Sequence, residues 1–573
     1  MAEEFTALPS NNQLARRKMS RKPTPIDELS NDWVRHLAKK YPSYATYLGF
    51  PGGEREMDDH SPTALKQARE DASEQIRKLE ALTPQDEVDE VSKDALLQEL
   101  KKEVKSYDSG LFFRDLNNIA SPAQGIRDIF DLSATSTEQD WDNLAARMTR
   151  VADSLRGYAE TLRISIKNQD APARRQVEEV IKQVEQITAA DGFFREFAKG
   201  AKPEAGELPA TLKQKLAEAA EAATGGYEEF GEFLKEELLP NSSTKDAIGR
   251  ERYALLSERF LGAIIDPDET YEWGREELSR IVSEQQEVAN IIKPGATVEE
   301  AFEILDKDPK SKLYGTDELQ KWMQKLSDQA IEKLNGVHFE IAEPIKKLEC
   351  MIAPTKHGGI YYTGPTDDFS RPGRMWWSVP EGVEEFNTWR ETTTVYHEGV
   401  PGHHLQIAQS VYVKDQLNDW RRLAAGTSGH AEGWALYAER LMEGFGFLDD
   451  PADRMGMLDG QRMRAARVVL DIGVHTEKQN LEGSGVWDFD YALNFMTKNV
   501  NMSPEFVRFE VTRYFGWPGQ APSYKVGQRI WEQILADYKA RKGERFSLKE
   551  FHKVALNLGG LGLDSLRRAM ARA

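Results

Sequence analysis

A long region of helical periodicity, from Asp27 to Glu340, constrains the fold of this chain more than any other feature of its sequence. Apolar residues recur there every three or four positions among glutamates and lysines, as amphipathic helices require. Clear examples are EDASEQIRKLEAL, KDALLQELKKEVKSY, RRQVEEVIKQVEQI and TLKQKLAEAAEAA. Turn-forming segments such as LTPQDE, LPNSS and KPGAT separate the helical ones. We therefore predict a mainly α-helical protein whose N-terminal region, residues 26–340, is a set of packed helices.

The character of the sequence changes after residue 340, where charge thins and glycines, aromatic residues and histidines gather. The segment GGIYYTGPTDDFSRPGRMWWSVP predicts two short strands around a turn, in a small antiparallel β-sheet beside the helix that follows. Its part GRMWWSV is a candidate edge strand for pairing with an extended peptide. Five of the ten histidines lie between His397 and His475. We therefore predict that residues 341–573 form a catalytic region, continuous in structure with residues 26–340.

The first 25 residues, MAEEFTALPSNNQLARRKMSRKPTP, are polar and lack the apolar centre of a signal peptide. We expect a disordered leader there. No run of 18 apolar residues occurs anywhere in the sequence. Cys350 is the single cysteine, so no disulfide can form within the chain. These features predict a soluble cytoplasmic protein.

The net charge of −20 restricts the partners of this protein. An acidic surface repels nucleic acid and anionic membranes on average, so neither is expected as a partner. A small peptide or amide substrate is compatible with this charge. The composition leaves the oligomeric state open.

One short segment, YHEGVPGHHLQ, resembles a metal-binding helix that has been interrupted. In the H-E-x-x-H signature, two histidines four positions apart share one helical face and hold a metal ion. Here His397 and Glu398 begin the pattern, but Pro401 stands where the second histidine belongs. Pro401 cannot continue the helix, and Gly399 and Gly402 tolerate unusual backbone angles. We therefore predict a bulge or kink across Gly399 to Gly402.

The bend leaves two candidates for the second metal ligand. If two extra residues are looped out, His403 returns to the position of the second histidine. His404 needs three extra residues, and in an unbroken helix it would lie too far along the axis to share one ion with His397. His403 is favoured, and His404 would then contact the substrate or a metal ligand.

A zinc site of this type needs a third protein ligand, commonly a carboxylate from a second helix. Glu432 occupies the first turns of such a helix in TSGHAEGWALYAERLMEGFG, among apolar neighbours. A carboxylate buried on an apolar helix requires a partner, and a cation held by two histidines provides one. Glu439 can support a ligand histidine by a hydrogen bond. We predict one zinc ion per chain, bound by His397, His403 and Glu432.

Further candidates for the site lie near the C-terminus. Tyr524, in the loop that opens a helix, is a candidate donor to the oxyanion that forms during hydrolysis. His475 is a second candidate donor, although a core histidine is an equally good interpretation. Arg513 and Lys525 are candidates for binding the C-terminal carboxylate of a peptide, or else they form surface ion pairs.

Three motifs, YHEGVPGHHLQ, GHAEGWALYAE and PGQAPSYKVG, together resemble the bacterial domain-of-unknown-function 885 (DUF885) family, from YPSYATYLG at Tyr41 to near the C-terminus. That family looks like a relative of the helical H-E-x-x-H zinc metallopeptidases. The resemblance implies a large α-helical metallopeptidase-like fold with a long substrate channel. It also implies a catalytic zinc on His397, His403 and Glu432, with Glu398 as the general base.

Three functional hypotheses follow. The leading one is a zinc-dependent peptidase that cleaves short peptides, as a carboxypeptidase, dipeptidase or oligopeptidase. The second is a zinc-dependent amidase that acts on a non-standard amide. The third is a helical binding protein with a vestigial metal site, which a general base such as Glu398 argues against, because a structural site needs none.

Overall fold

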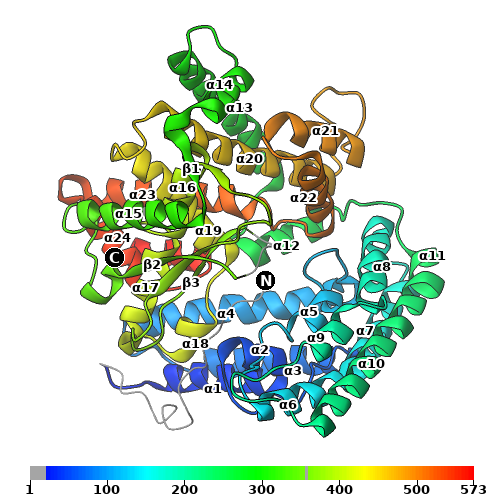
Figure 1. Cartoon of the computed structure of the whole chain (residues 1–573). Helices are drawn as coiled ribbons and strands as arrows, with labels where there is room; N and C mark the ends of the chain where they lie inside the picture. The colour runs from blue at the N-terminus through cyan, green and yellow to red at the C-terminus, as the bar shows by residue number, and fades with distance from the viewer. Residues whose placement is uncertain (1–20, 355–358) are drawn as a thin grey trace.

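The computed structural model describes residues 21–354 and 359–573 (Figure 1). Of the predicted leader, residues 1–20 lie outside this part of the chain. Helix α1 (Pro25–Lys40) begins where the leader was expected to end. The Thr24 hydroxyl accepts a hydrogen bond from the Asp27 backbone N–H at 3.2 Å, and the Asp27 carboxylate accepts one from the Thr24 backbone N–H at 3.0 Å. This reciprocal cap pairs two N–H groups that a helix start leaves unsatisfied.

Helices from both ends of the chain share one large apolar core. Its buried members run from Ile26 to Met570, so this larger core includes residues on both sides of residue 340. The apolar stripes that the sequence shows along these helices form it. The helices that contribute to it before residue 340 are α1, α2 (Pro42–Leu48), α3 (Pro62–Glu80), α4 (Glu87–Asp108), α12 (Arg250–Leu261), α13 (Pro267–Ile292), α14 (Val298–Lys307) and α15 (Thr316–Leu334).

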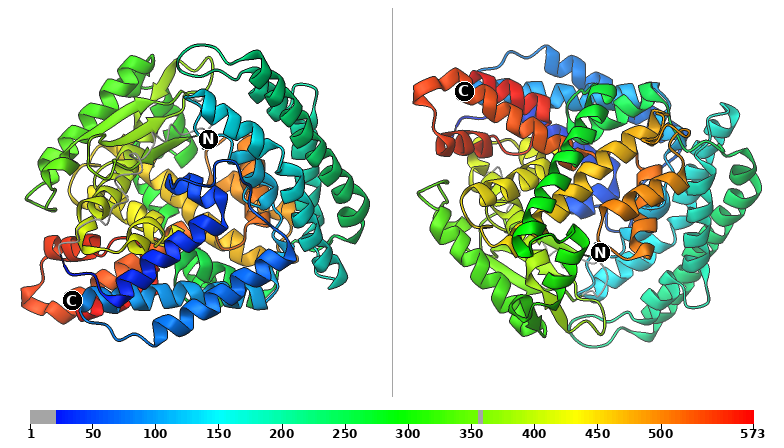
Figure 2. Two further views of the ribbon diagram at one scale, coloured as in Figure 1. Left: turned by 90° about the horizontal axis from the view of Figure 1, so that it is seen from below. Right: turned by 90° about the horizontal axis from the view of Figure 1, so that it is seen from above.

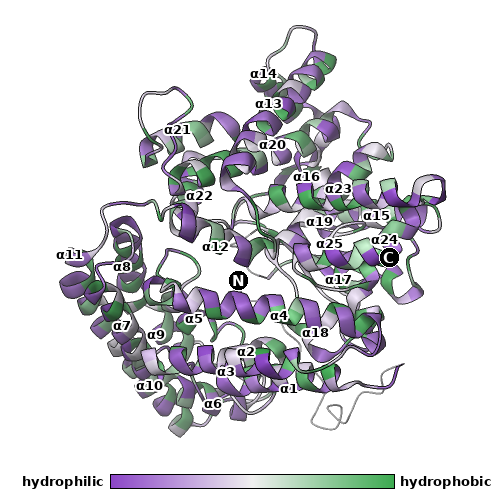
Figure 3. Ribbon diagram, turned by 180° about the vertical axis from the view of Figure 1, so that it is seen from behind, coloured by the Kyte–Doolittle hydropathy of each residue, from purple (hydrophilic) through white to green (hydrophobic). Residues whose placement is uncertain are grey.

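A second, smaller core has buried members that run only from Leu116 to Leu238. The surrounding helices lie together on one side of the molecule in all three views of Figure 1 and Figure 2. Figure 3 shows apolar and polar residues on different sides of the longer ones. These helices are α5 (Pro122–Asp128), α6 (Glu138–Met148), α7 (Val151–Lys167), α8 (Arg174–Thr188), α9 (Phe193–Lys199), α10 (Ala210–Phe233) and α11 (Leu239–Asn241).

A buried glutamine of α8 links the helices of the smaller core to the rest of the protein. The Gln176 side-chain amide donates to the Thr512 carbonyl at 3.0 Å, and its carbonyl oxygen accepts from the Asn118 backbone N–H at 3.0 Å. Thr512 belongs to α22 (Pro504–Gly516), a helix of the larger core.

Two small sheets lie between the helices. Strands β1 (Lys312–Tyr314) and β5 (Glu385–Asn387) form an antiparallel pair. The two strands predicted around the turn are β3 (Ile360–Thr363) and β4 (Gly373–Trp377), which also pair in antiparallel fashion. The sequence pattern did not reveal β2 (Leu348–Ile352), which pairs with β4 in parallel fashion. β4 is consequently the central strand of the order β2-β4-β3, so the predicted edge strand GRMWWSV has both edges occupied.

The remaining helices of the larger core carry the candidate site residues. They are α16 (Thr388–Glu398), α17 (His403–Tyr412), α18 (Asp419–Leu423), α19 (Ser428–Gly444), α20 (Pro451–His475), α21 (Phe489–Asn499), α22, α23 (Ser523–Lys542), α24 (Leu548–Asn557) and α25 (Leu563–Arg572). The mainly α-helical fold with a small antiparallel sheet is therefore confirmed. No helix among the described residues combines the length and the apolar character that crossing a membrane requires.

Glycines bring α19 and α23 into backbone contact. A Cβ on Gly433 would lie 2.4 Å from the carbonyl carbon of Gly527, and a Cβ on Gly527 would lie 2.3 Å from the carbonyl oxygen of Gly429. Any larger side chain at either position would force the two helices apart. This crossing sets the separation between Glu432 on α19 and Tyr524 at the start of α23.

Candidate metal centre

A glycine-proline bend joins the two helices that carry the predicted histidines. α16 ends next to His397 and α17 begins at His403, so Gly399 to Gly402 form a break between two helices. The Gly402 backbone N–H donates to the Tyr396 carbonyl at 3.1 Å. A Cβ on Gly402 would lie 1.8 Å from the His397 carbonyl oxygen, a contact that only glycine avoids. The predicted bend is present, and it ends one helix and starts another.

A tryptophan of α19 holds this bend from the side. The Trp434 indole N–H donates to the Pro401 carbonyl at 2.9 Å and lies 3.3 Å from the Gly402 carbonyl oxygen. Trp434 is fully buried and follows Glu432 by two residues. The helix that supplies the acidic group of the site therefore also fixes the backbone between the two histidines.

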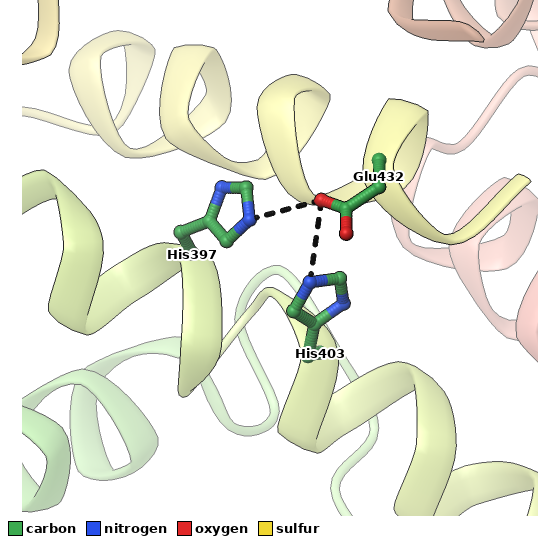
Figure 4. Close-up of side chains that lie close together, drawn as sticks. All are labelled: His397, His403 and Glu432. Atoms are coloured by element: carbon green, nitrogen blue, oxygen red, sulfur yellow. Dashed lines mark hydrogen bonds and ion pairs between the residues drawn. The ribbon is translucent and has the colours of Figure 1, made fainter. Parts of the chain in front are cut away.

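The structure brings His397, His403 and Glu432 together (Figure 4). One potential ligand atom from each lies within 4.8 Å of the other two. Glu432 Oε2 lies 3.2 Å from Nε2 of His397 and 3.5 Å from Nε2 of His403. The two imidazole rings stand perpendicular, with their centroids 4.9 Å apart. Both histidines are buried, whereas the Glu432 side chain is 22% exposed, so the cluster is open on the carboxylate side.

The charges in the cluster attract a cation to the point between the two histidines. Burial raises the pKa of Glu432, but His403 and His397 outweigh it and hold that pKa well below its ordinary value. Burial lowers the pKa of His397, but hydrogen bonds with Glu432 and Glu439 outweigh it and raise this pKa to about 10. The carboxylates thus favour positive charge at this point.

The donor set fits zinc. His397 Nδ1–H donates to Glu439 Oε1 at 2.8 Å, which directs the lone pair of Nε2 toward Glu432 and His403. A ligand histidine oriented by a carboxylate in this way is a regular feature of protein zinc sites. Two imidazoles and one carboxylate are also a common ligand set for zinc that keeps a fourth position open. These three residues would therefore hold the ion.

Glu398 lies at the end of α16, beside the ligand cluster. It is 8% exposed, and its carboxylate makes no hydrogen bond to another described residue. Burial raises its pKa, and the charges of His403 and His397 act against that rise. A carboxylate without a partner and with a raised pKa is well suited to accept a proton from water.

A chain of buried side chains continues behind His397. Glu439 Oε2 accepts from the Gln461 side-chain amide at 3.1 Å, and Gln461 Oε1 accepts from Lys525 Nζ at 2.6 Å. Lys525 also pairs with Glu277 at 2.9 Å and is 1% exposed. The substrate contact predicted for Lys525 does not appear, because its ammonium group is fully engaged behind the metal ligands.

Tyr524 is the predicted donor that the structure places close to the cluster. The charge of Glu432 is the first cause that raises the pKa of Tyr524, ahead of burial. Its side chain is partly exposed, and its hydroxyl makes no hydrogen bond to another described residue. The Arg467 guanidinium lies over its ring at 5.3 Å from the centroid. The hydroxyl is therefore available to a substrate beside Glu432.

Arg513 is engaged away from any substrate. Its guanidinium donates to both carboxylate oxygens of Glu510, at 3.1 and 2.9 Å, and to the side-chain oxygen Oε1 of Gln520 at 2.6 Å. It is 8% exposed. The structure gives Arg513 the role of a buried ion pair in place of the predicted substrate contact.

His475 is a core histidine. Its Nε2–H donates to the Tyr514 carbonyl at 2.9 Å, and its ring stacks on Tyr253. It is fully buried, which lowers its pKa to about 4. The structure thus favours the core interpretation over the predicted catalytic one.

His404 points away from the cluster. Its Nε2–H donates to the Ile345 carbonyl at 2.7 Å, and its Nδ1 accepts from the Tyr362 hydroxyl at 2.9 Å. It is 1% exposed. Neither ring nitrogen remains for a metal ion or a substrate, so the predicted substrate contact of His404 does not appear and His403 is the histidine in the cluster.

Two supporting residues, Trp434 and Gln461, were not predicted. The sequence does contain a pattern that indicates Gln461. Together with Arg464 and Arg467 it forms a series of polar residues three positions apart within a largely apolar helix. Polar residues at this spacing share one helical face. Trp434 had no comparable signal, since an apolar residue next to Gly433 also suits an ordinary core.

Residues 42–570 match the model of a family described as bacterial protein of unknown function (DUF885). No curated protein is similar to this chain.

Solved structures share the fold. A candidate lipoprotein from Colwellia psychrerythraea is 22% identical with a TM-score of 0.81, over 96% of this chain and 98% of that chain. A candidate lipoprotein of unknown function from Shewanella oneidensis is 17% identical with a TM-score of 0.74, over 96% of this chain and 100% of that chain. A carboxypeptidase from Pyrococcus furiosus is 11% identical, over 96% of this chain and 99% of that chain. Its TM-score of 0.40 is too low to indicate a common fold.

Proposed function

The chain belongs to the DUF885 family, and because the function of that family is unknown, we propose from the site itself that this protein is a zinc-dependent hydrolase of short peptides. One observation carries the proposal. His397, His403 and Glu432 converge beside the carboxylate of Glu398 and the phenol of Tyr524, neither of which has a hydrogen-bond partner in the part of the chain that the structure describes. This combination of cation ligands, base and oxyanion donor is what hydrolysis of an amide bond requires.

Zinc held by His397, His403 and Glu432 would supply Lewis acidity, which polarises a carbonyl group and eases the ionisation of water. Glu398 accepts the proton of the attacking water and transfers it to the nitrogen of the leaving amine. Its raised pKa brings its affinity for protons closer to neutral pH. Such a base typically contributes ~10²–10⁴-fold to the rate.

Tyr524 acts on the other side of the reacting carbonyl. Its hydroxyl donates a hydrogen bond to the carbonyl oxygen as negative charge develops there. Glu439, held by Gln461, keeps His397 in the tautomer that presents Nε2. A base with no hydrogen-bond partner has no use in a purely structural metal site, which supports a hydrolase over a binding protein with a vestigial site.

The first test is metal content, measured by elemental mass spectrometry on purified protein. We expect one zinc per chain in the wild type. His403→Ala should lose the metal, because it removes one of three ligands. His404→Gln is the matched control: it changes the neighbouring histidine, whose nitrogens bind Tyr362 and Ile345, and it should retain zinc.

The second test is turnover. Glu398→Gln should retain zinc and lose hydrolysis of short peptides by at least about 100-fold, as expected for removal of a general base. Glu391→Gln, on the same helix, is its control and should remain active. Hydrolysis by protein stripped of metal would contradict the proposal. Hydrolysis of small amides but of no peptide would favour the amidase hypothesis. The cytoplasmic location and a small-molecule partner remain predictions.

A further inference from the structure

The cations that surround the candidate site differ in whether their charge is compensated. Arg513 and Lys525 are both paired with carboxylates, those of Glu510 and Glu277. Neither is therefore available to bind the carboxylate of a substrate. A cation that serves this purpose must lie beside the reacting groups and lack an acidic partner in the protein itself.

Arg464 lies on α20 between two residues that contact the candidate site. On α20 it stands three residues after Gln461 and three before Arg467, so the three side chains follow one face of the helix. Gln461 contacts Glu439, which orients His397, and the Arg467 guanidinium lies over the ring of Tyr524. The face of α20 that carries Arg464 therefore contacts Glu439 on one side of Arg464 and Tyr524 on the other.

Arg464 also lacks an acidic partner among the described residues. No carboxylate oxygen of a residue in the described ranges lies within 4.0 Å of its nitrogens. Within the same ranges its one hydrogen bond is from Nη1 to the Gly460 carbonyl of its own helix, at 3.2 Å. Its Nε is buried without an acceptor. By contrast Arg467, one turn further on, donates to the Tyr514 hydroxyl at 2.7 Å and to Glu510 at 2.8 Å.

The arginines on this side of the site are not matched one to one by carboxylates in ion pairs. Arg467 and Arg513 share the carboxylate of Glu510, and Arg464 forms no ion pair with a described residue. The charge of Arg464 also acts on Tyr524, where it opposes the rise in the pKa of the phenol. A guanidinium without a carboxylate partner of its own is suited to bind an anionic group.

We propose that the Arg464 guanidinium binds the free C-terminal carboxylate of the substrate, so that the protein acts on peptides with an unblocked C-terminus. This inference rests on the proposed function. The planar guanidinium suits a carboxylate, because two parallel N–H groups match its two oxygens. The half-buried position of Arg464 strengthens such a pair relative to one on the surface.

The experiment compares each peptide as the free acid and as the C-terminal amide. Binding to zinc-loaded Glu398→Gln protein is measured by calorimetry, and kcat/KM is measured with wild-type protein. We expect the free acid to be favoured about 10- to 100-fold in both measurements, as for a hydrogen bond between charged groups. Arg464→Met should bring the ratio of acid to amide close to one, and Arg464→Lys should restore part of it.

Arg462→Met is the matched control. Arg462 is two residues away on the same helix, and its guanidinium binds Asn499, Gln285 and the Lys498 carbonyl. This variant should keep the wild-type ratio. If peptides are hydrolysed but the acid and the amide react equally, the role of Arg464 is refuted while the hydrolase stands. If free acids bind in an Arg464-dependent manner without turnover, the role of Arg464 stands and the hydrolase fails. No binding of either form overturns both.

Discussion

At the residue scale, the position of His397 depends on side chains that never reach the substrate. Glu439 accepts from His397, Gln461 donates to Glu439, and Lys525 donates to Gln461. All are buried. Removing a middle member leaves a carboxylate free to turn, so the imidazole that it holds loses its fixed orientation.

We expect Gln461→Leu to raise the dissociation constant for zinc about 10- to 100-fold, the usual effect of losing a group that orients a metal ligand. Equilibrium titration with zinc against a chelating indicator measures it. Circular dichroism establishes that the variant remains folded.

Gln528→Leu is the control for this prediction. Gln528 also accepts from Lys525, at 3.0 Å, but it makes no contact with Glu439. Its loss should leave the affinity for zinc near that of the wild type. An equal loss of zinc affinity in both variants would mean that a general disturbance of the core causes it, and not the loss of the contact with Glu439.

The residues of the cluster were predictable, because their chemistry is local in the sequence. Three local patterns pointed to the cluster: a histidine next to a glutamate, a glycine-proline break, and a carboxylate on an apolar helix. A buried carboxylate in particular requires a cationic partner. The roles of Arg513 and Lys525 were not predictable in this way. Their partners, Glu510 for one and Glu277 and Gln461 for the other, are chosen by packing of helices distant in the chain.

At the element scale, the contact between α19 and α23 fixes how far Tyr524 stands from Glu432. Gly433→Ala would place a Cβ 2.4 Å from the Gly527 backbone, so the helices must separate. We expect a loss of about 1–3 kcal/mol in the free energy of unfolding, as for overpacking elsewhere. Urea denaturation measures the loss, and the zinc-loaded variant should also lose turnover because Tyr524 moves.

Gly444→Ala tests the same substitution at the end of the same helix. A Cβ there meets nothing within 4 Å. Since alanine is the better helix former, this variant should be as stable as the wild type or slightly more so. If both variants lose the same stability, the close crossing is not the reason.

Helices and strands with strong hydrophobic periodicity were predictable from the sequence. Elements that form only because they pair with a distant segment were not. The amphipathic segments up to Glu340 and the pair β3 and β4 carry patterns of their own. β2 contains Glu349 and Cys350 without regular alternation, and it becomes a strand by pairing with β4. The sequence around Gly433 does not reveal that it is a contact surface, because its neighbour Gly527 is 94 positions away.

At the scale of the whole molecule, the candidate site lies entirely in the larger core, and the smaller core stands apart from it. A ligand that binds only the folded state stabilises it by about 2.7 kcal/mol at 100 times its dissociation constant. Zinc should therefore raise the melting temperature, and its removal by a chelator should reverse the change.

The two cores also predict where the stabilisation appears. With zinc, amide hydrogen exchange should slow in α16, α17 and α19, which carry the ligands, and change little in α7 and α10. Exchange mass spectrometry with and without zinc measures both regions. Equal slowing in α7 and α10 would show that the two cores open as one unit.

The break between α16 and α17 changes what determines the geometry of the metal centre. In one continuous helix the separation of two ligands is dictated by the helical repeat, and the backbone cannot adjust without losing its own hydrogen bonds. Here His397 and His403 belong to two separate helices, and Trp434 stabilises the bend between them by a hydrogen bond. Two histidines six positions apart can therefore approach one ion as closely as two histidines four positions apart on a continuous helix. The angle between α16 and α17 then sets the distance between the two ligand nitrogens. The geometry of the metal site depends on that angle, and the spacing of the histidines in the sequence is one of several ways to produce it.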